Sequence, residues 1–180
     1  MKFIFDFDDV LFHTTKKFRE HENAILEKAG ISRETSMEYS KKERWNLFSL
    51  RKMLAHFSVP PELYEKIMEK SKNHVNEELR EIIEKLGKPN CYLVTYGDEE
   101  FQLDKIKRSG IMPLFSEVIV VIGSKKEAIE KICAKYKNEK VIFVDDKAKH
   151  FEDLDFIKYP NLKTILYDER GLEKLTSILS

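Results

Sequence analysis

The chain begins with an alternation of apolar and polar positions that leads directly into acidic residues. Phenylalanines stand at positions 3, 5 and 7, whereas Ile4, Asp6 and Asp8 would share the opposite face of a strand. Ligands of open α/β sheets bind at strand ends of this kind. Burying a carboxylate beside an apolar core is costly unless a cation or hydrogen-bond donors compensate it. This stretch therefore predicts a strand whose end needs a metal ion or a basic partner.

Apolar residues then recur at helical spacing from about residue 14 to residue 88. Thr14 or Thr15 would cap the first of these helices. A stripe from Leu47 to Phe57 marks another, and Gly87 followed by Pro89 would end the last. This stretch is predicted to be wholly helical.

The pattern changes after residue 89, where short apolar runs alternate with helical segments. The runs that predict strands cover residues 91–95, 118–122, 141–144 and 162–166. Helices are expected from about Asp98 to Ser109, after a capping box of Ser124 and Glu127, and from about Gly171. Strands alternating with helices imply right-handed crossovers and a parallel sheet covered on both faces.

The predicted fold is α/β, with a Rossmann-like parallel sheet flanked by helices and a small α-helical cap inserted after the first strand. Residues 1–13 and 89–180 would form the α/β core domain, and residues 14–88 the helical cap domain. No glycine-rich phosphate loop follows any predicted strand, so the chain has neither a P-loop nor a dinucleotide fingerprint.

Composition narrows the functional classes. The chain has 180 residues, with 32 Lys and Arg balancing 32 Asp and Glu, so no basic excess indicates nucleic-acid or membrane binding. No apolar run is long enough to span a bilayer and no signal peptide is visible, so we expect a cytoplasmic protein. Cys91 and Cys133 are expected to be buried free thiols. Either a monomer or a dimer is compatible with the sequence.

Polar residues stand at four of the predicted strand ends, which a parallel sheet brings to one edge. They are Asp6, Asp8, Thr95, Lys125, Lys126, Asp145 and Asp146. Taken singly, several have structural interpretations: Thr95 is a common strand residue, Asp146 could cap a helix, and Lys125 could be a surface lysine. Together, several acids, a hydroxyl and an ammonium fit an Mg²⁺-assisted phosphoryl site. One carboxylate can attack phosphorus while a second carboxyl group protonates the leaving oxygen.

In order and spacing these motifs resemble the haloacid dehalogenase superfamily, over the whole predicted core. The matching segments are Phe3-Ile-Phe-Asp6-Phe-Asp8-Asp9-Val10-Leu11, Leu93-Val94-Thr95, a lysine near a helix start, and Val144-Asp145-Asp146. The longer run from Val94 through Gly97 and Gln102 to Lys105 resembles the phosphatase branch. For the lysine we prefer Lys125 to Lys126, because it leaves Ala128 and Ile129 in the usual relation to it.

The resemblance implies a role for each of these residues. Asp6 would be the nucleophile and a metal ligand, and Asp8 the general acid and then the base, binding the metal through its backbone carbonyl. Thr95 and Lys125 would hold the phosphoryl oxygens. Asp146 together with Asp145 would complete the Mg²⁺ shell. Dehalogenases of the superfamily lack the second acid, so Asp8 resembles the phosphotransfer members, and the helical insertion resembles the family's first class of cap.

Two positions depart from the family pattern. His150 stands where members often carry Asp or Asn, which affects the outer metal shell. Asp9 stands where sugar-phosphate mutases of the family often have glycine. In the cap, Lys41, Lys42, Arg44 and Trp45 form a basic and aromatic cluster that either meets a phosphate or a base, or is a solvated helix face.

These observations predict an Mg²⁺-dependent phosphatase that hydrolyses a small phosphomonoester through an aspartyl-phosphate. The substrate would be a small phosphorylated metabolite such as a nucleotide or sugar phosphate. The alternatives are a phosphosugar mutase and a non-catalytic phosphate-binding or signalling domain of the same fold. A binding-only member would be expected to lack Asp6 or Asp8, and a receiver domain would lack the helical insertion.

Overall fold

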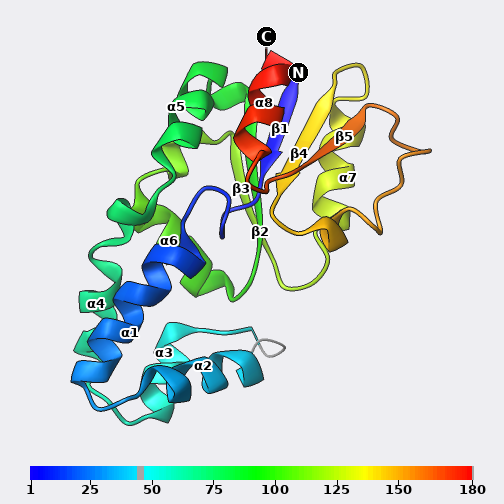
Figure 1. The fold of residues 1–180 in the computed structure, drawn as a ribbon. Coiled ribbons are helices and arrows are strands. Elements are labelled where there is room, and N and C mark those ends of the chain that lie inside the picture. Colours follow the sequence, from blue (N-terminus) through cyan, green and yellow to red (C-terminus); the bar gives the residue numbers. More distant parts are fainter. Residues whose placement is uncertain (44–46, 180) are drawn as a thin grey trace.

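A computed structural model describes residues 1–43 and 47–179, and its centre is a five-stranded parallel sheet (Figure 1). The strands are β1 (Lys2–Phe5), β2 (Cys91–Tyr96), β3 (Glu117–Val121), β4 (Val141–Asp145) and β5 (Leu162–Leu166). Their order across the sheet is β3-β2-β1-β4-β5, so β1 is the middle strand. The predicted α/β class with a Rossmann-like parallel sheet is confirmed.

Burial differs between the centre and one edge of this sheet. Every residue of β4, and all of β2 except Tyr96, is buried, as expected for continuous apolar strands covered on both faces. The apolar run in β3 predicted the same, but residues 118–121 are only half-buried. The reason is position, because β3 is an edge strand with one neighbour.

Two hydrophobic clusters cover the two faces of the sheet. One contains Phe3 and Phe5 of β1 and is closed by α5 (Glu77–Leu86), α6 (Glu99–Ser109) and α8 (Gly171–Leu179). The other contains Ile4 and is closed by α7 (Lys126–Lys135). The alternation at the start of the chain thus places successive side chains in different clusters.

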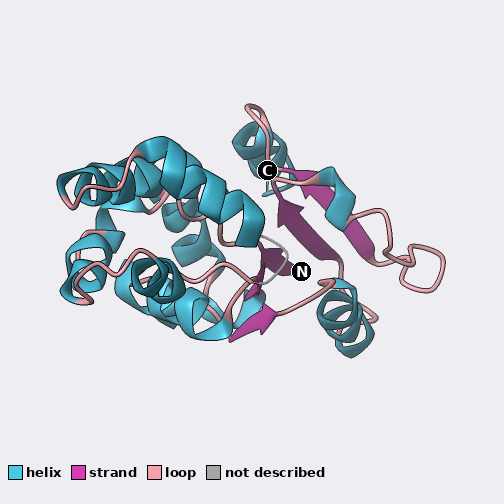
Figure 2. Ribbon diagram, turned by 90° about the horizontal axis from the view of Figure 1, so that it is seen from below, coloured by secondary structure: helices cyan, strands magenta, loops and turns pink. Residues whose placement is uncertain are grey.

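The stretch between β1 and β2 is helical, as predicted. It contains a π-helix at Thr14–Phe18, α1 (Arg19–Lys28), α2 (Arg33–Lys42), α3 (Leu50–His56), α4 (Glu62–Met68), a 3₁₀ helix at Ser71–His74, and α5. Helices α1 to α4 lie beyond the end of the sheet toward which the β1 arrow points (Figure 1), and in the view from below most of the helices are grouped on one side of the strands (Figure 2).

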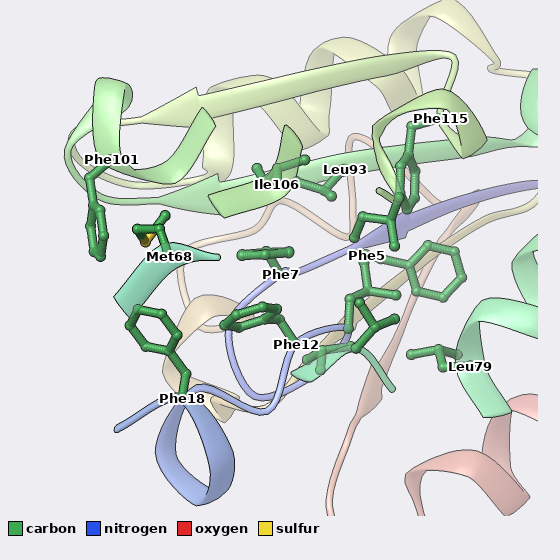
Figure 3. Packing of buried hydrophobic residues seen from close by; sticks show 14 of the residues in the cluster. Phe5, Phe7, Phe12, Phe18, Met68, Leu79, Leu93, Phe101, Ile106 and Phe115 are labelled. Carbon is green, nitrogen blue, oxygen red and sulfur yellow. The ribbon is translucent and has the colours of Figure 1, made fainter. Parts of the chain in front are cut away.

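These helices share the larger cluster with the sheet. Phe7 and Phe12 follow β1, Phe18 ends the π-helix, and Met68 and Phe101 come from α4 and α6. Their side chains lie together beyond the end of β1 (Figure 3). The packing is therefore continuous from the face of the sheet into the helical stretch.

Two of the predicted helix caps are wrong. Neither Thr14 nor Thr15 caps a helix, because their hydroxyls instead donate to the carboxylates of Asp8 and Asp9. The expected capping box does not form either, because α7 begins one residue late, at Lys126, whose amide donates to the hydroxyl of Ser124 at 3.0 Å. At α6 the expected ends are confirmed, with Asp98 capping and Gly110 in the left-handed conformation.

Further 3₁₀ turns stand at Lys88–Asn90, Met112–Leu114 and Ala148–His150. Within residues 1–43 and 47–179, no helix is both long and apolar enough to cross a membrane.

Candidate active site

Asp6 directly follows the central strand. Its backbone amide donates to the carbonyl oxygen of Val144 at 2.9 Å, which continues the pairing between β1 and β4. Its buried carboxylate accepts through Oδ1 from the backbone amide of Phe7 and from the ammonium of Lys125, both at 2.7 Å. A main-chain donor and a cation thus hold this carboxylate at the end of the sheet.

Lys125 lies in the turn before α7, and its ammonium joins two carboxylates. Its Nζ is 2.7 Å from Asp6 Oδ1 and 2.7 Å from Oδ2 of Asp145, the last residue of β4. Asp145 also accepts from the backbone amide of Lys147 at 2.8 Å, and its Oδ2 lies 2.8 Å from His150 Nδ1. The side chains of Asp6, Lys125 and Asp145 are all buried.

The pKa values of Asp6 and Asp145 are shifted in opposite directions. Burial raises the pKa of Asp6 to about 6, with a further contribution from Asp145, although Lys125 opposes the shift. Burial also disfavours ionisation of Asp145, but its bond with His150 and the charge of Lys125 outweigh this and lower its pKa. His150 and Lys125 together therefore compensate Asp145, whereas Lys125 alone does not compensate the burial of Asp6.

Asp8 has a separate set of partners. Its Oδ1 lies 2.6 Å from Lys105 Nζ and accepts from the hydroxyl of Thr14, and its Oδ2 accepts from Gln102 Nε2 at 2.7 Å. Burial alone would raise the pKa of Asp8, but Lys105 and these donors lower it to about 2. Asp8 is therefore ionised in this structure.

A small cavity of about 150 Å³ opens at this end of the sheet. Its lining residues are Asp6, Asp8, Thr95, Tyr96, Lys125, Lys147, Lys149 and His150. Thr95, near the end of β2, is buried in its wall. Two carboxylates, a hydroxyl and several cations thus face one space the size of a small anion and a few waters.

A larger cleft of about 620 Å³ adjoins the cavity. Both are lined by Asp8, Tyr96 and Lys147. Most of the rest of its wall comes from the π-helix, α1, α2 and α6, with Arg19 among the polar residues, and Phe48, before α3, is among the apolar ones. Asp8 therefore lies at the boundary between the two spaces.

The structure brings most of the predicted site residues together. Asp6, Asp8, Thr95 and Lys125 line the cavity, and Asp6, Asp145 and His150 offer ligand atoms within 4.8 Å of one another. Asp146 does not belong to that group, and its carboxylate lies 3.3 Å from Lys147 Nζ. Burial raises the pKa of Asp146.

The structure also distinguishes between the two candidate lysines and between the members of the predicted cap cluster. Lys125 reaches the acids, whereas Lys126 contacts the backbone carbonyl of Asp153 on the exposed surface. In the basic and aromatic cluster predicted for the cap, Lys41 lines the cleft and Lys42 is not among its lining residues. Arg44 and Trp45 lie outside the described residues.

Sequence reasoning assigned no role to three residues at the site. Lys147 lines the cavity and the cleft, and Gln102 and Lys105 bind Asp8. Gln102 and Lys105 are three residues apart on α6, so they lie on one helix face. The signal available was that both fall on the buried face of this helix, beside Phe101 and Ile106.

Comparison with known proteins identifies the class to which this fold and this arrangement of acids belong. The family model for haloacid dehalogenase-like hydrolases matches residues 3–154, which contain β2 to β4, β1 apart from its first residue, and every residue of the cavity. The chain belongs to this family. No curated protein gave a match.

Several solved structures share the fold. A structure described as a haloacid dehalogenase-like hydrolase from Burkholderia xenovorans is 18% identical, with a TM-score of 0.71 over 94% of this chain and 86% of that one. A HAD-hydrolase from Bacillus subtilis, described as bound to magnesium, is 15% identical, with a TM-score of 0.61 over 99% and 98%. A structure described as a β-phosphoglucomutase from Thermotoga maritima is 17% identical, with a TM-score of 0.58 over 99% and 100%. At these identities the likeness concerns the fold.

Proposed function

We propose that this hydrolase is an Mg²⁺-dependent phosphatase that cleaves a small phosphomonoester through an aspartyl-phosphate on Asp6. The observation that carries the proposal is that Asp6, Asp8, Thr95 and Lys125 line one cavity of about 150 Å³. A nucleophile, a second acid and two phosphoryl-binding groups are the parts that such a reaction requires.

In the first half-reaction a carboxylate oxygen of Asp6 attacks phosphorus. A bond forms between that oxygen and phosphorus, and the bond from phosphorus to the leaving oxygen breaks. With a pKa of about 6, Asp6 is mostly ionised at neutral pH and so can attack. Thr95 and Lys125 hold the phosphoryl oxygens and offset their charge.

Asp8 supplies the proton that the leaving oxygen needs. A phosphoryl group entering the cavity brings negative charge next to Asp8, and a nearby like charge favours the protonated carboxyl group. In the second half-reaction Asp8 takes a proton from water, which attacks phosphorus and releases Asp6 and inorganic phosphate. Its position between cavity and cleft suits both steps, because a phosphoryl group in the cavity and a leaving group in the cleft would place the leaving oxygen at the same boundary.

The oxygen donors around Asp6 fit a magnesium ion, which prefers carboxylate and carbonyl ligands. Asp6, Asp145, Asp146 and the backbone carbonyl of Asp8 would hold the ion, which supplies positive charge beside the phosphoryl oxygens. His150 offers a nitrogen atom near Asp145 but is already bonded to it, so we assign it the positioning of that carboxylate.

Residues 14–88 would act as a cap domain on a core of residues 1–13 and 89–180. The support is that the π-helix, α1 and α2 contribute to the wall of the 620 Å³ cleft next to the cavity. A leaving group in this cleft would be selected by these helices. The substrate would then be a small phosphorylated metabolite, such as a nucleotide or sugar phosphate.

Hydrolysis of 4-nitrophenyl phosphate by the purified protein tests this proposal. We expect activity with Mg²⁺, loss of it with EDTA, and a decrease of at least ~10³-fold in Asp6→Asn because the nucleophile is removed. Asp168→Asn is the matched control, since this aspartate binds Lys174 on the surface and does not line the cavity.

Other outcomes would redirect the assignment. Activity that survives in Asp6→Asn would contradict the aspartyl-phosphate. Transfer of the phosphoryl group between positions of a sugar phosphate, with little release of inorganic phosphate, would identify a phosphosugar mutase. A folded protein that binds beryllofluoride with Mg²⁺ but turns over no ester in a metabolite panel would be a phosphate-binding or signalling domain.

A further inference from the structure

Lys105 is a buried lysine inside an otherwise aromatic environment. It lies on α6 with only 2% of its surface exposed. Its Nζ lies between 5.0 and 5.9 Å from the ring centroids of Phe7, Phe12, Phe18 and Phe101. These four rings, seen together in Figure 3, line the junction between β1, α6 and the helical stretch.

An ammonium group in this place is costly unless an acid compensates it. An apolar side chain of similar length would pack against the four rings without that cost. The acid that faces Lys105 is Asp8, at 2.6 Å. Glu22 of α1 is also buried and close enough to feel its charge, but its carboxylate is held by Arg19 at 2.9 Å.

The other bonds of Asp8 come from neutral groups. Gln102, one turn before Lys105 on α6, donates to Asp8 Oδ2 and also to the backbone carbonyl of Tyr96, at 3.0 Å. A Cβ atom at Gly97 would lie 2.7 Å from Gln102 Nε2, so glycine is needed there for this approach. Thr14 donates to Oδ1, the oxygen that Lys105 binds. The carboxylate therefore has donors on both oxygens, of which Lys105 supplies the positive charge.

We propose that Lys105 is a positioning residue for the reaction, holding the Asp8 carboxylate at the boundary between the cavity and the cleft from inside the aromatic core. This inference rests on the proposed function, because it relates the orientation of the Asp8 carboxylate to its role as general acid and base. Without the ammonium, the partly exposed carboxylate gains hydration by turning into the cavity and leaves the place of the leaving oxygen.

The test compares Lys105→Met with the wild type on two aryl esters. Methionine keeps length and apolar character among the rings, and Lys107→Met is the control because Lys107 is exposed on the same helix. Phenoxide is a much more basic leaving group than 4-nitrophenoxide, so phenyl phosphate depends more on a proton from Asp8. The parameter is kcat/KM, which covers the steps up to release of the first product.

We expect kcat/KM of Lys105→Met to fall about 100-fold for phenyl phosphate and less than about 10-fold for 4-nitrophenyl phosphate, because general acid catalysis contributes on this scale. Lys107→Met should match the wild type on both. Equal losses on the two esters would mean that Lys105 only supports the fold, and would overturn the proposal. Lys105→Gln repeats the comparison if the methionine variant does not fold.

Crystal structures of the wild type and Lys105→Met provide a readout that does not depend on turnover. We expect the Asp8 carboxylate to turn away from Gln102 in the variant while the rest of the fold is unchanged. An unchanged Asp8 would overturn the inference. If the wild type hydrolyses neither ester nor any phosphomonoester of the metabolite panel, the proposed phosphatase function fails, whereas the two structures still decide whether Lys105 holds Asp8.

Discussion

Asp6 and Asp8 are two residues apart, yet their surroundings differ in kind. Asp6 shares the ammonium of Lys125 with Asp145, so three buried groups carry two negative charges and one positive charge. Asp8 faces Lys105 together with two neutral donors. The pKa of Asp6 is accordingly raised to about 6 and that of Asp8 lowered to about 2. Lys125 is shared between Asp6 and Asp145, whereas Lys105 faces Asp8 together with the two neutral donors, and this difference accounts for the opposite shifts.

The difference gives the two acids opposite effects on stability. The ordinary pKa of an aspartate side chain is 3.8. The folded pKa of Asp6 is higher, so its ionisation destabilises the fold, and this contribution grows as the pH rises from 3.8 to about 6. The folded pKa of Asp8 is lower, so its stabilising contribution is complete above 3.8 and is lost as the pH falls toward 2.

Removing the shared cation should have the largest effect. Lys125→Met leaves the carboxylates of Asp6 and Asp145 buried without their ammonium, and we expect a loss of about 3–5 kcal/mol in the free energy of unfolding. Urea denaturation at pH 7 in EDTA measures it. Lys126→Met is the control, expected to change stability by less than about 1 kcal/mol because its side chain is 42% exposed and makes only a loose ion pair with Glu130 at 3.6 Å. Equal losses in the two variants would contradict the role of Lys125.

Neutralising Asp6 should stabilise the protein. With a shift of about two pKa units, Asp6→Asn is expected to gain up to about 3 kcal/mol at pH 8 in EDTA. The gain should shrink as the pH falls below 6 and vanish near pH 4, where the wild-type carboxyl group is protonated. Thermal unfolding at pH 8 and pH 4 checks this. A variant less stable than the wild type at pH 8 would show that Lys125 over-compensates Asp6.

Neutralising Asp8 should have the opposite and smaller effect. Asp8→Asn is expected to lose about 2 kcal/mol at pH 7, because Lys105 loses its acid partner. The part due to Asp8 ionisation should decline only below pH 3.8 and be gone near pH 2. Urea titrations at pH 7 and pH 3 measure the change. Stability equal to the wild type at pH 7 would mean that another acid, such as Glu22, compensates Lys105.

The sequence predicted the parts of the site that stand at strand ends. Apolar runs identified the strands, and a parallel sheet necessarily places their carboxyl ends on one edge, so Asp6, Thr95 and Asp145 come together across long separations. The order of the strands did not follow from these runs, because each is apolar enough to be central. The half-exposed β3 shows this ambiguity.

The environment of Asp8 was harder to predict. Its partners come from Thr14 at the start of the π-helix and from the side of α6, not from another strand end. Periodicity predicted α6 and its caps but gave no orientation relative to β1. A lysine on the buried face of a helix, next to Ile106, was nevertheless a usable sign that an acid lies opposite.

The central position of β1 also affects how the chain assembles. Its neighbours are β2, which begins at Cys91, and β4, which begins at Val141. During synthesis on the ribosome, β1 therefore emerges long before either neighbour is available. The phenylalanines and backbone of β1 cannot pack or pair with these strands until most of the chain has been made. Contacts between residues so far apart in the sequence also form slowly. A nascent chain with this strand order therefore exposes an unpaired apolar strand, and exposed strands of this kind favour aggregation and binding by chaperones.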